Sequence, residues 1–238
     1  MRVHPRVRHA LIIALLSLAN ASCDDAPDKG KPDPAPVMKE AMVLDGVAIT
    51  RKEIEDWLPY LREVSPSTGH NSGMRYLLDR YLIPMAFART KFATRHEEQR
   101  KNAEGIAKVL GDSAGYAELL ERTRKFSGAE VLTDLLRTDL PLPEQRWLFD
   151  DANVGRVSPV LETAQGFSLV AASDKQPGLT KAFDRVDAIL VRFYTHTAKD
   201  HGKWCQALKV RLGSLAPEAI KVHPEFRDAL PNWPKPKK

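Results

Sequence analysis

The stretch Gly155–Ala172 constrains the fold of this chain most, because its spacing predicts two short strands joined by a tight turn. Apolar residues in Val157–Leu161 come before a polar connection, and the apolar run Phe167–Ala172 follows it. The pair Gln165-Gly166 supplies a glycine, which can adopt a positive φ angle at no steric cost. The same pattern also fits a hairpin in any mixed domain, so it predicts local structure and not function.

The first residues, Met1–Ser22, have the organisation of an export signal. Three arginines precede the apolar run Ala10–Leu18, which is too short to be a stable membrane anchor. Two processing interpretations compete. In the one we favour, Ala21-Ser22-Cys23 resembles a bacterial lipobox, and Cys23 becomes the lipidated first residue that anchors the chain to the membrane. In the other, cleavage after Ala21 releases a soluble periplasmic protein. Both predict export to a bacterial cell envelope, facing the periplasm.

The charge of the chain argues against nucleic-acid binding. The full sequence has 36 basic and 31 acidic residues, and removal of the leader leaves 33 basic residues and a net charge of +2. The lysines of the C-terminal tail account for this excess, and no basic stripe with interleaved aromatic residues occurs. We therefore exclude DNA and RNA as partners.

Composition predicts a tether followed by about 200 residues that can fold. The segment after Cys23 has four prolines and alternating charges, which is typical of an extended spacer. The DLPLP sequence at Asp139–Pro143 breaks the helical pattern and marks a boundary. The predicted layout is a signal peptide over residues 1–22, a lipidated cysteine and tether over 23–37, a helical domain over 38–138, a second domain over 139–230 and a flexible tail over 231–238.

The region before this boundary is predicted to be helical. Thr50 and Glu53 have the spacing of a capping box, after a short strand over Met42–Ile49. A long helix is expected over Met74–His96, with a kink at Pro84. The remaining expected helices cover residues 97–108, 116–125 and 129–136.

The second region mixes strands with helices. A short helix is expected over Pro143–Asn153, before the hairpin. Val186–Tyr194 is rich in β-branched and aromatic residues and predicts a strand, and Ala198–Leu212 predicts an amphipathic helix. The fold class is therefore α+β, mainly helical, with a short sheet.

Other chemistry-bearing residues favour structural roles. His196 and His201 would lie about 140° apart on a helix, which fits no common zinc spacing and predicts solvated side chains. Asp150-Asp151 favours a cap or turn. Cys205 is expected to be a small buried apolar residue without a disulfide partner. No phosphate loop, serine elbow or C-x-x-C motif occurs, so no cofactor, metal or catalytic residue is predicted.

Two stretches resemble one group of proteins. The hairpin resembles the final hairpin of parvulin-type prolyl isomerase domains, and the matching residues are Gly155, Val157, Ser158, Pro159, Val160, Thr163, Gly166, Phe167 and Leu169. The N-terminal segment is similar to that of periplasmic foldases of the SurA and PrsA type, through Gly46, Ile49, Thr50, Glu53 and Ile54. The resemblance implies a SurA/PrsA-like helical domain before the boundary and a parvulin-like domain after it.

The resemblance also shows what is missing from the isomerase site. It implies a peptide-binding role for Phe167, Ser168 and Thr163, but Ser168 stands where the family has a histidine. The family's first strand, with its own histidine, does not precede the hairpin. Its nearest counterpart, Asp187–Leu190, comes after the hairpin without a histidine, so either the sheet is rearranged or the domain is truncated.

Three functions follow from these observations. The resemblance favours a membrane-tethered chaperone or assembly factor that binds unfolded, nascent secreted or outer-membrane polypeptides without isomerase activity. An active prolyl isomerase of parvulin type is the first alternative. An accessory lipoprotein of a secretion or export complex is the second.

Overall fold

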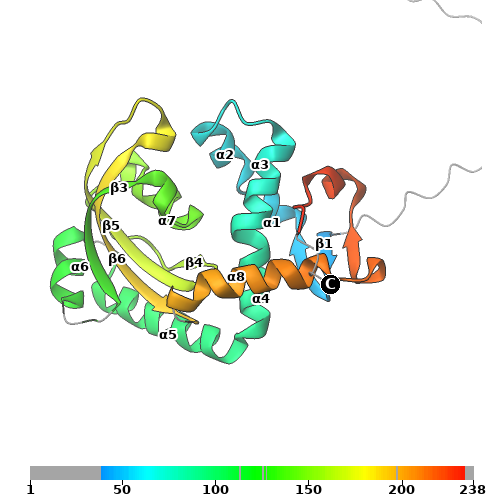
Figure 1. The fold of residues 1–238 in the computed structure, drawn as a ribbon. Helices are drawn as coiled ribbons and strands as arrows, with labels where there is room; N and C mark the ends of the chain where they lie inside the picture. Colours follow the sequence, from blue (N-terminus) through cyan, green and yellow to red (C-terminus); the bar gives the residue numbers. More distant parts are fainter. Residues whose placement is uncertain (1–38, 113, 125, 127, 197, 234–238) are drawn as a thin grey trace, which may run out of the picture. The chain divides into compact units, whose positions relative to one another are not determined.

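A computed structural model of the chain describes residues 39–112, 114–124, 126, 128–196 and 198–233. The predicted leader, Cys23 and the tether lie outside the described residues. The helices are α1 (Arg51–Glu55), α2 (Leu58–Val64), α3 (His70–Leu77), α4 (Ile83–Lys91), α5 (Ala93–Leu110), α6 (Tyr116–Thr123), α7 (Leu142–Leu148) and α8 (Ala198–Gly213). The strands are β1 (Glu40–Leu44), β2 (Val47–Thr50), β3 (Ala129–Leu136), β4 (Leu161–Thr163), β5 (Gly166–Gln176), β6 (Arg185–Tyr194) and β7 (Ile220–Val222). This mixture confirms an α+β fold (Figure 1).

The N-terminal segment contains a hairpin rather than one interrupted strand. β1 and β2 pair in antiparallel register through a turn in which Asp45 and Gly46 both have positive φ angles. β7, from near the C-terminus, pairs with the other edge of β1, which gives the sheet order β2-β1-β7. The short strand predicted at the start of the helical region is therefore a two-stranded hairpin, and β7 adds a third strand to it from the far end of the chain.

The predicted capping box is confirmed. The hydroxyl of Thr50 accepts a hydrogen bond from the backbone N–H of Glu53 at 3.2 Å, and the Glu53 carboxylate accepts one from the Thr50 N–H at 2.9 Å. These bonds satisfy donors that the first turn of α1 would otherwise leave unpaired. The helix then packs Ile54 into the core.

The long helix predicted over Met74–His96 is divided. α3 begins at His70, four residues before the predicted start, and a π-helical turn at Leu78–Leu82 joins it to α4. Pro84 is the second residue after this turn and has no N–H to donate to the turn, which accounts for the wider helical geometry at the predicted kink. A second break, at Phe92, separates α4 from α5.

The opening hairpin and the predicted strand Val186–Tyr194 belong to one antiparallel sheet with the order β3-β6-β5-β4. β4 and β5 form the hairpin, in which Gly166 has a φ angle of 140°. A Cβ atom at this position would lie 2.1 Å from the Phe193 carbonyl oxygen, so both the turn and the approach of β6 require glycine. β6 pairs with β5 along its length, with Ala172 opposite Ala188.

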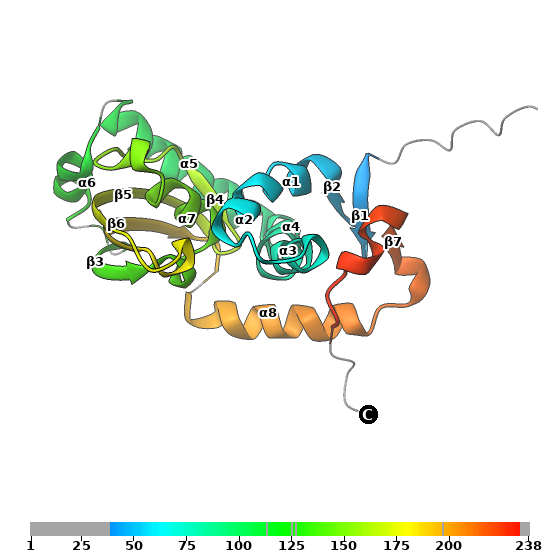
Figure 2. The same cartoon turned by 90° about the horizontal axis from the view of Figure 1, so that it is seen from above.

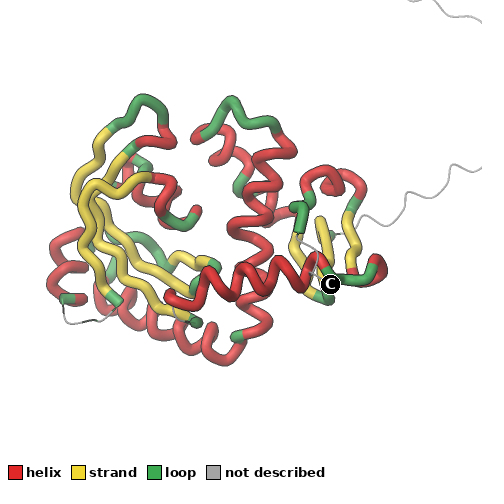
Figure 3. Tube along the Cα trace, viewed as in Figure 1, coloured by secondary structure: helices red, strands yellow, loops and turns green. Residues whose placement is uncertain are grey.

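β3 corrects a prediction, because residues 129–136 were expected to be a helix. Its residues pair in antiparallel register with β6, from Ala129 opposite Val191 to Leu136 opposite Arg185. The partner strand lies about 50 residues away in sequence, so a local pattern of apolar residues could not indicate it. Figure 3 shows this segment as a strand at the edge of the sheet.

Alternate residues of β5 face two different cores. Phe167, Leu169 and Ala171 pack against α5 and α6, together with Ile189, Val191 and Phe193 of β6. Val170 and Ala172 face α7 and the residues around it. The period of two along β5 therefore separates the layer of α5 and α6 from the layer of α7.

A third core holds β1, β2 and the helices α1 to α4, and α8 closes it. Leu208 and Leu212 of α8 are buried there, together with Phe226 near the C-terminus. Figure 2 shows α8 running from the end of β6 toward β7. The chain from position 38 onward clusters into one compact unit, and β3 pairs across the predicted boundary at Asp139. The division into two domains stays a prediction.

Candidate functional site

The residues that the resemblance assigned to peptide binding are all buried. Thr163, Phe167 and Ser168 have exposed fractions of 4%, 4% and 0%, and none of them lines any of the cavities described below. Thr163 has a local role, because its hydroxyl donates to the Gly166 carbonyl at 3.3 Å and accepts from the Gln165 N–H at 3.2 Å. A peptide-binding role for these three residues stays a prediction.

A polar cluster does face Phe167. The His96 ring lies edge-on to the Phe167 ring at 4.6 Å between centroids, and His96 Nε2 lies 3.0 Å from Glu162 Oε1. Arg89 binds the same carboxylate with two nitrogens, at 2.5 and 2.7 Å. Burial disfavours the charged form of Glu162, but the bonds from Arg89 and the nearby His96 outweigh it and lower its pKa to about 2. Arg89 also reaches Glu53, so this cluster ties α1, α4 and β4 together.

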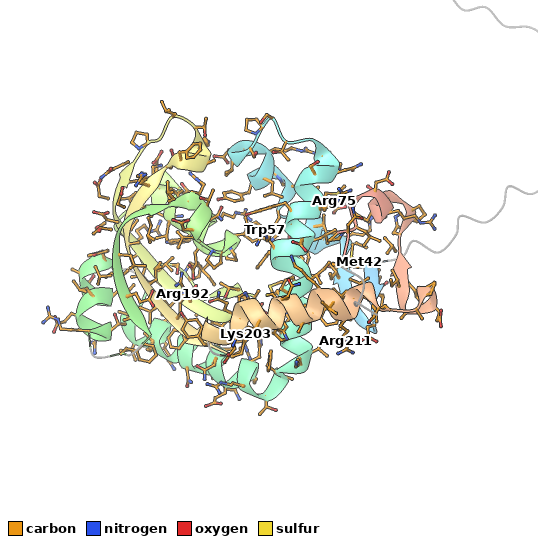
Figure 4. The ribbon with its side chains drawn as sticks, in the orientation of Figure 1. Met42, Trp57, Arg75, Arg192, Lys203 and Arg211 are labelled. Atoms are coloured by element: carbon orange, nitrogen blue, oxygen red, sulfur yellow. The ribbon has the colours of Figure 1, made fainter. Side chains whose placement is uncertain are left out.

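On the opposite face, Ser168 lies beside a buried ion pair. Ser168 is in register with Arg192 of β6, whose nitrogens bind the Glu144 carboxylate of α7 at 2.7 and 3.1 Å. Glu144 is fully buried, and the Ser168 hydroxyl has no hydrogen-bond partner among the described residues. Figure 4 labels Arg192 on the sheet. The space in front of the position where the family has a histidine is therefore filled by α7 and its ion pair.

An apolar cavity lies elsewhere, between α2 and α3 on one side and α7 with the turns at the end of the sheet on the other. Its volume is about 480 Å³. Its lining residues are Leu58, Tyr60, Leu61, Arg62, Val64, Ser65, Pro66, Thr68, Gly69, His70, Gly73, Tyr76, Arg137, Thr138, Leu142, Gln145 and Ala182. We call this cavity the cleft. Most of the surface of its wall is apolar, which is typical of ligand pockets.

Buried polar contacts hold the two walls of the cleft together. The Tyr60 hydroxyl accepts a hydrogen bond from Arg137 at 3.2 Å and donates one to Gln145 at 3.3 Å. Arg137 in turn ion-pairs with Asp184 at 2.7 Å. At the rim, Lys181 lies 2.5 Å from the carboxylate of Glu63. The wall from α2 and the wall from the sheet are therefore fixed relative to one another.

A second cavity of about 470 Å³ adjoins the cleft, because Tyr76, Thr138 and Leu142 line both. Ala164 and Gln165 from the hairpin turn line its far side. The shared residues place the two cavities next to one another, one reaching the loop before α3 and the other reaching the turn of the hairpin. Tyr76 stands at the junction with 44% of its surface exposed.

The prediction that His196 and His201 are separate, solvated side chains is wrong. His196 Nε2 lies 2.8 Å from His201 Nδ1, and the Cys205 sulfur lies 3.4 Å from His201 Nε2. The helical angle does not apply, because α8 begins only at Ala198 and His196 precedes it. The ring of Phe92 stacks on His196 at 5.1 Å. Cys205 is half-buried beside an imidazole rather than buried among apolar side chains.

Burial favours the neutral forms throughout this cluster. It lowers the pKa of His196, and together with the neighbouring His196 it lowers that of His201 to about 4. Burial also raises the pKa of the Cys205 thiol. The hydrogen bonds are consistent with a neutral chain in which Cys205 donates to His201 and His201 donates to His196. The cluster therefore joins the end of β6 to α8 without charge.

The aspartate pair behaves as expected, and no described group suits a metal. The Asp150 carboxylate accepts a hydrogen bond from the Ala152 N–H at 3.0 Å, which is a local cap.

Within the described ranges, no group of three or more His, Cys, Asp or Glu residues is arranged to hold a metal ion. No described helix is long and apolar enough to cross a membrane.

Sequence reasoning missed the residues that line the cleft. Tyr60, Tyr76 and Leu142 lie on three helices whose amphipathic patterns predict only packing. The one available signal is Tyr76 itself, an aromatic residue within a polar stretch of α3.

Comparison of the chain with models of protein families, with curated proteins and with solved structures finds no match.

Proposed function

We propose that this chain is a membrane-tethered extracytoplasmic chaperone or assembly factor that binds unfolded or extended polypeptides in the cleft. The observation that carries the proposal is the apolar cleft of about 480 Å³ between α2, α3 and the turns at the end of the sheet, which lies next to a second cavity. Pockets that bind ligands have volumes of about 300–1,000 Å³ and mostly apolar walls. An extended chain advances about 3.3 Å per residue, so its side chains can enter the two cavities in succession.

Two exposed apolar side chains near the cleft support binding to unfolded chains. Leu179 and Phe183 lie on the connection between β5 and β6 that also supplies Ala182 to the cleft. Leu179 is fully exposed, and Phe183 has an exposed fraction of 60%. Exposed apolar side chains beside an apolar cavity are typical of a surface that meets other chains.

The surroundings of Ser168 support binding without catalysis. The buried Arg192–Glu144 ion pair occupies the space in front of it, and Phe167 packs against His96 inside the structure. A catalyst of prolyl isomerisation must bring polar groups to a substrate amide and lower a barrier of about 18–20 kcal/mol. The buried positions of Phe167 and Ser168 leave no described route for a substrate to reach them.

The test uses aggregation of an unfolded client protein. The wild-type chain at stoichiometric excess is expected to suppress light scattering, and Tyr76→Ser is expected to lose most of this effect because it removes the aromatic ring shared by the two cavities. Val109→Ser, at a position on α5 with an exposed fraction of 62%, removes an apolar side chain outside both cavities and should behave as wild type. Equal effects of the two substitutions, or no suppression by wild type, would contradict the proposal.

Two further measurements separate the alternatives. A protease-coupled assay on an Xaa-Pro peptide should show the rate of buffer alone, and a faster rate that is lost in Phe167→Ala would favour a prolyl isomerase. Capture from membranes distinguishes the accessory role, since one stable partner would favour a dedicated complex and many transient clients favour the chaperone.

A further inference from the structure

The charged residues that line the cleft are all basic. Arg62 and Arg137 contribute to its wall, together with the imidazole of His70, and its lining contains no aspartate or glutamate. A cavity with one sign of charge and an apolar wall favours ligands of the opposite charge. Which of these basic groups is available depends on its partners.

The charge of Arg137 is already compensated. Its Nη2 lies 2.7 Å from the Asp184 carboxylate, its Nε donates to the Lys181 carbonyl at 2.7 Å, and its Nη1 donates to Tyr60. With these bonds each nitrogen of the guanidinium has a partner inside the structure. Arg137 therefore shapes the cleft and is not free to bind an anion.

Arg62 is different, because no described carboxylate pairs with it. The neighbouring Glu63 binds Lys181 instead, at 2.5 Å. The contact described for the Arg62 guanidinium is with Nδ1 of His70, at 3.5 Å. Arg62 is exposed at the same wall that presents Leu58 and Leu61.

The geometry of this pair suits a carboxylate. Arginine has no acceptor, so in its contact with Nδ1 of His70 the Arg62 guanidinium is the donor. The remaining N–H groups of the guanidinium form the planar fork that binds carboxylates with two parallel hydrogen bonds. An apolar side chain in the cleft would place a nearby carboxylate within reach of this fork.

We infer that the cleft selects polypeptide segments in which a carboxylate lies next to an aromatic or large aliphatic side chain. The inference rests on the proposed function and names the class of segment that the same cleft prefers. The apolar side chain enters the cavity between α2, α3 and the sheet, and the carboxylate pairs with Arg62 at its wall. A glutamate or aspartate side chain and a free C-terminus offer the same chemistry.

The test measures binding of four dye-labelled peptides by fluorescence anisotropy at low salt. Three of the peptides have blocked termini and the same Leu-Phe-Leu core, which is flanked by Glu, by Gln or by Lys. The fourth peptide is the Gln peptide with its chain ending in a free carboxylate directly after the core. We expect the Glu peptide to bind about twofold to fivefold more tightly than the Gln peptide, as for a partly exposed ion pair, and the Lys peptide to bind most weakly. If the free-carboxylate peptide binds as tightly as the Glu peptide, a free C-terminus can supply the carboxylate. If it binds only as tightly as the Gln peptide, the preference belongs to acidic side chains. Both results support the inference.

Two variants test whether the preference for the Glu peptide depends on Arg62. Arg62→Gln should bind the Glu and Gln peptides equally, whereas Arg95→Gln, an exposed arginine on α5 outside the cleft, makes the same change in net charge and should keep the preference. Equal binding of Glu, Gln and Lys peptides to the wild-type chain would overturn the inference and leave the proposed function standing. A preference for Glu that survives Arg62→Gln would also overturn it. Failure of every peptide to bind would instead contradict the proposed function.

Discussion

The Nη2 atom of Arg137 lies 2.7 Å from Oδ2 of Asp184, and both side chains are largely buried where the sheet meets the cleft. Asp184 also accepts a hydrogen bond from the Gly178 N–H at 2.9 Å. Burial disfavours its charge, but these two donors outweigh the effect and lower its pKa. Through Arg137 the pair fixes Tyr60, so one ion pair at the end of the sheet positions the opposite wall.

Removing one partner of this pair should therefore be costly. Asp184→Asn leaves the Arg137 charge buried without a carboxylate, and we expect a loss of roughly 3 kcal/mol in the free energy of unfolding. Asp134→Asn removes the carboxylate of an exposed pair with Arg185 and should cost less than about 1 kcal/mol. Urea unfolding followed by circular dichroism measures both. Similar losses of stability in the two variants would show that Asp184 is not needed to compensate the charge of Arg137.

The histidine pair predicts a dependence of stability on pH. The pKa of His201 is lowered to about 4 and that of His196 is lowered too, so the folded chain keeps both neutral where the unfolded chain takes up protons. The stability that the neutral pair contributes is complete above the unfolded pKa of 6.5 and is lost as the pH falls from 6.5 toward 4. Urea unfolding at several pH values in this window should show a smaller decline in the free energy of unfolding for His201→Gln than for wild type. His223→Gln, outside the cluster, should keep the wild-type decline; an unchanged decline in His201→Gln would rule out this origin.

The Glu162 cluster makes a prediction for more acidic solution. Its lowered pKa of about 2 means that the stability from its bonds to Arg89 and His96 is present above pH 4.5 and is lost as the pH falls toward 2. Glu162→Gln should lower the free energy of unfolding by roughly 1–3 kcal/mol at neutral pH, as for the loss of charged hydrogen bonds. The difference from wild type should shrink as the pH falls through this window. Glu97→Gln, on the exposed surface of α5, should change stability little at either pH, and a constant difference for Glu162→Gln would contradict the assignment.

Replacement of Ser168 should change the stability of the chain in the opposite direction, because its buried hydroxyl has no partner among the described residues. Ser168→Ala removes an unsatisfied polar group and should be neutral or stabilising by up to about 1 kcal/mol. Thr163→Ala, at a buried hydroxyl with two hydrogen bonds, should instead destabilise by about 1–3 kcal/mol. Thermal unfolding of the two variants provides the comparison. A clear destabilisation by Ser168→Ala would indicate a partner that the structure does not contain.

The parts of the fold that the sequence predicts correctly are those encoded by neighbouring residues. The capping box at Thr50 and Glu53, the turn at Gly166 and the strand ending at Tyr194 each follow from local spacing or residue type. α8 follows from an amphipathic pattern, confirmed over Ala198–Gly213. In each case the signal is local, although β6 itself pairs with the distant strands β5 and β3.

The parts that were missed depend on distant segments. β3 became a strand because β6 offers it an open edge, and β7 joins β1 from the other end of the chain. The cleft requires α2 and α3 to lie opposite the end of the sheet, which no periodicity indicates. The proximity of His196 to His201 depended on a helix start two residues after His196. Non-local pairing and an exact helix boundary are the features that a single sequence specifies least.

Site-specific photocrosslinking at Tyr76 tests the central claim most directly. The full chain would carry benzoylphenylalanine in place of Tyr76, where the two cavities meet, or in place of Val109 on α5 as the control. Irradiation with an unfolded client should give a crosslinked product at position 76 at least several times stronger than at position 109. An excess of folded client should give neither. Equal crosslinking at the two positions, or none at position 76, would contradict binding of unfolded polypeptides in the cleft.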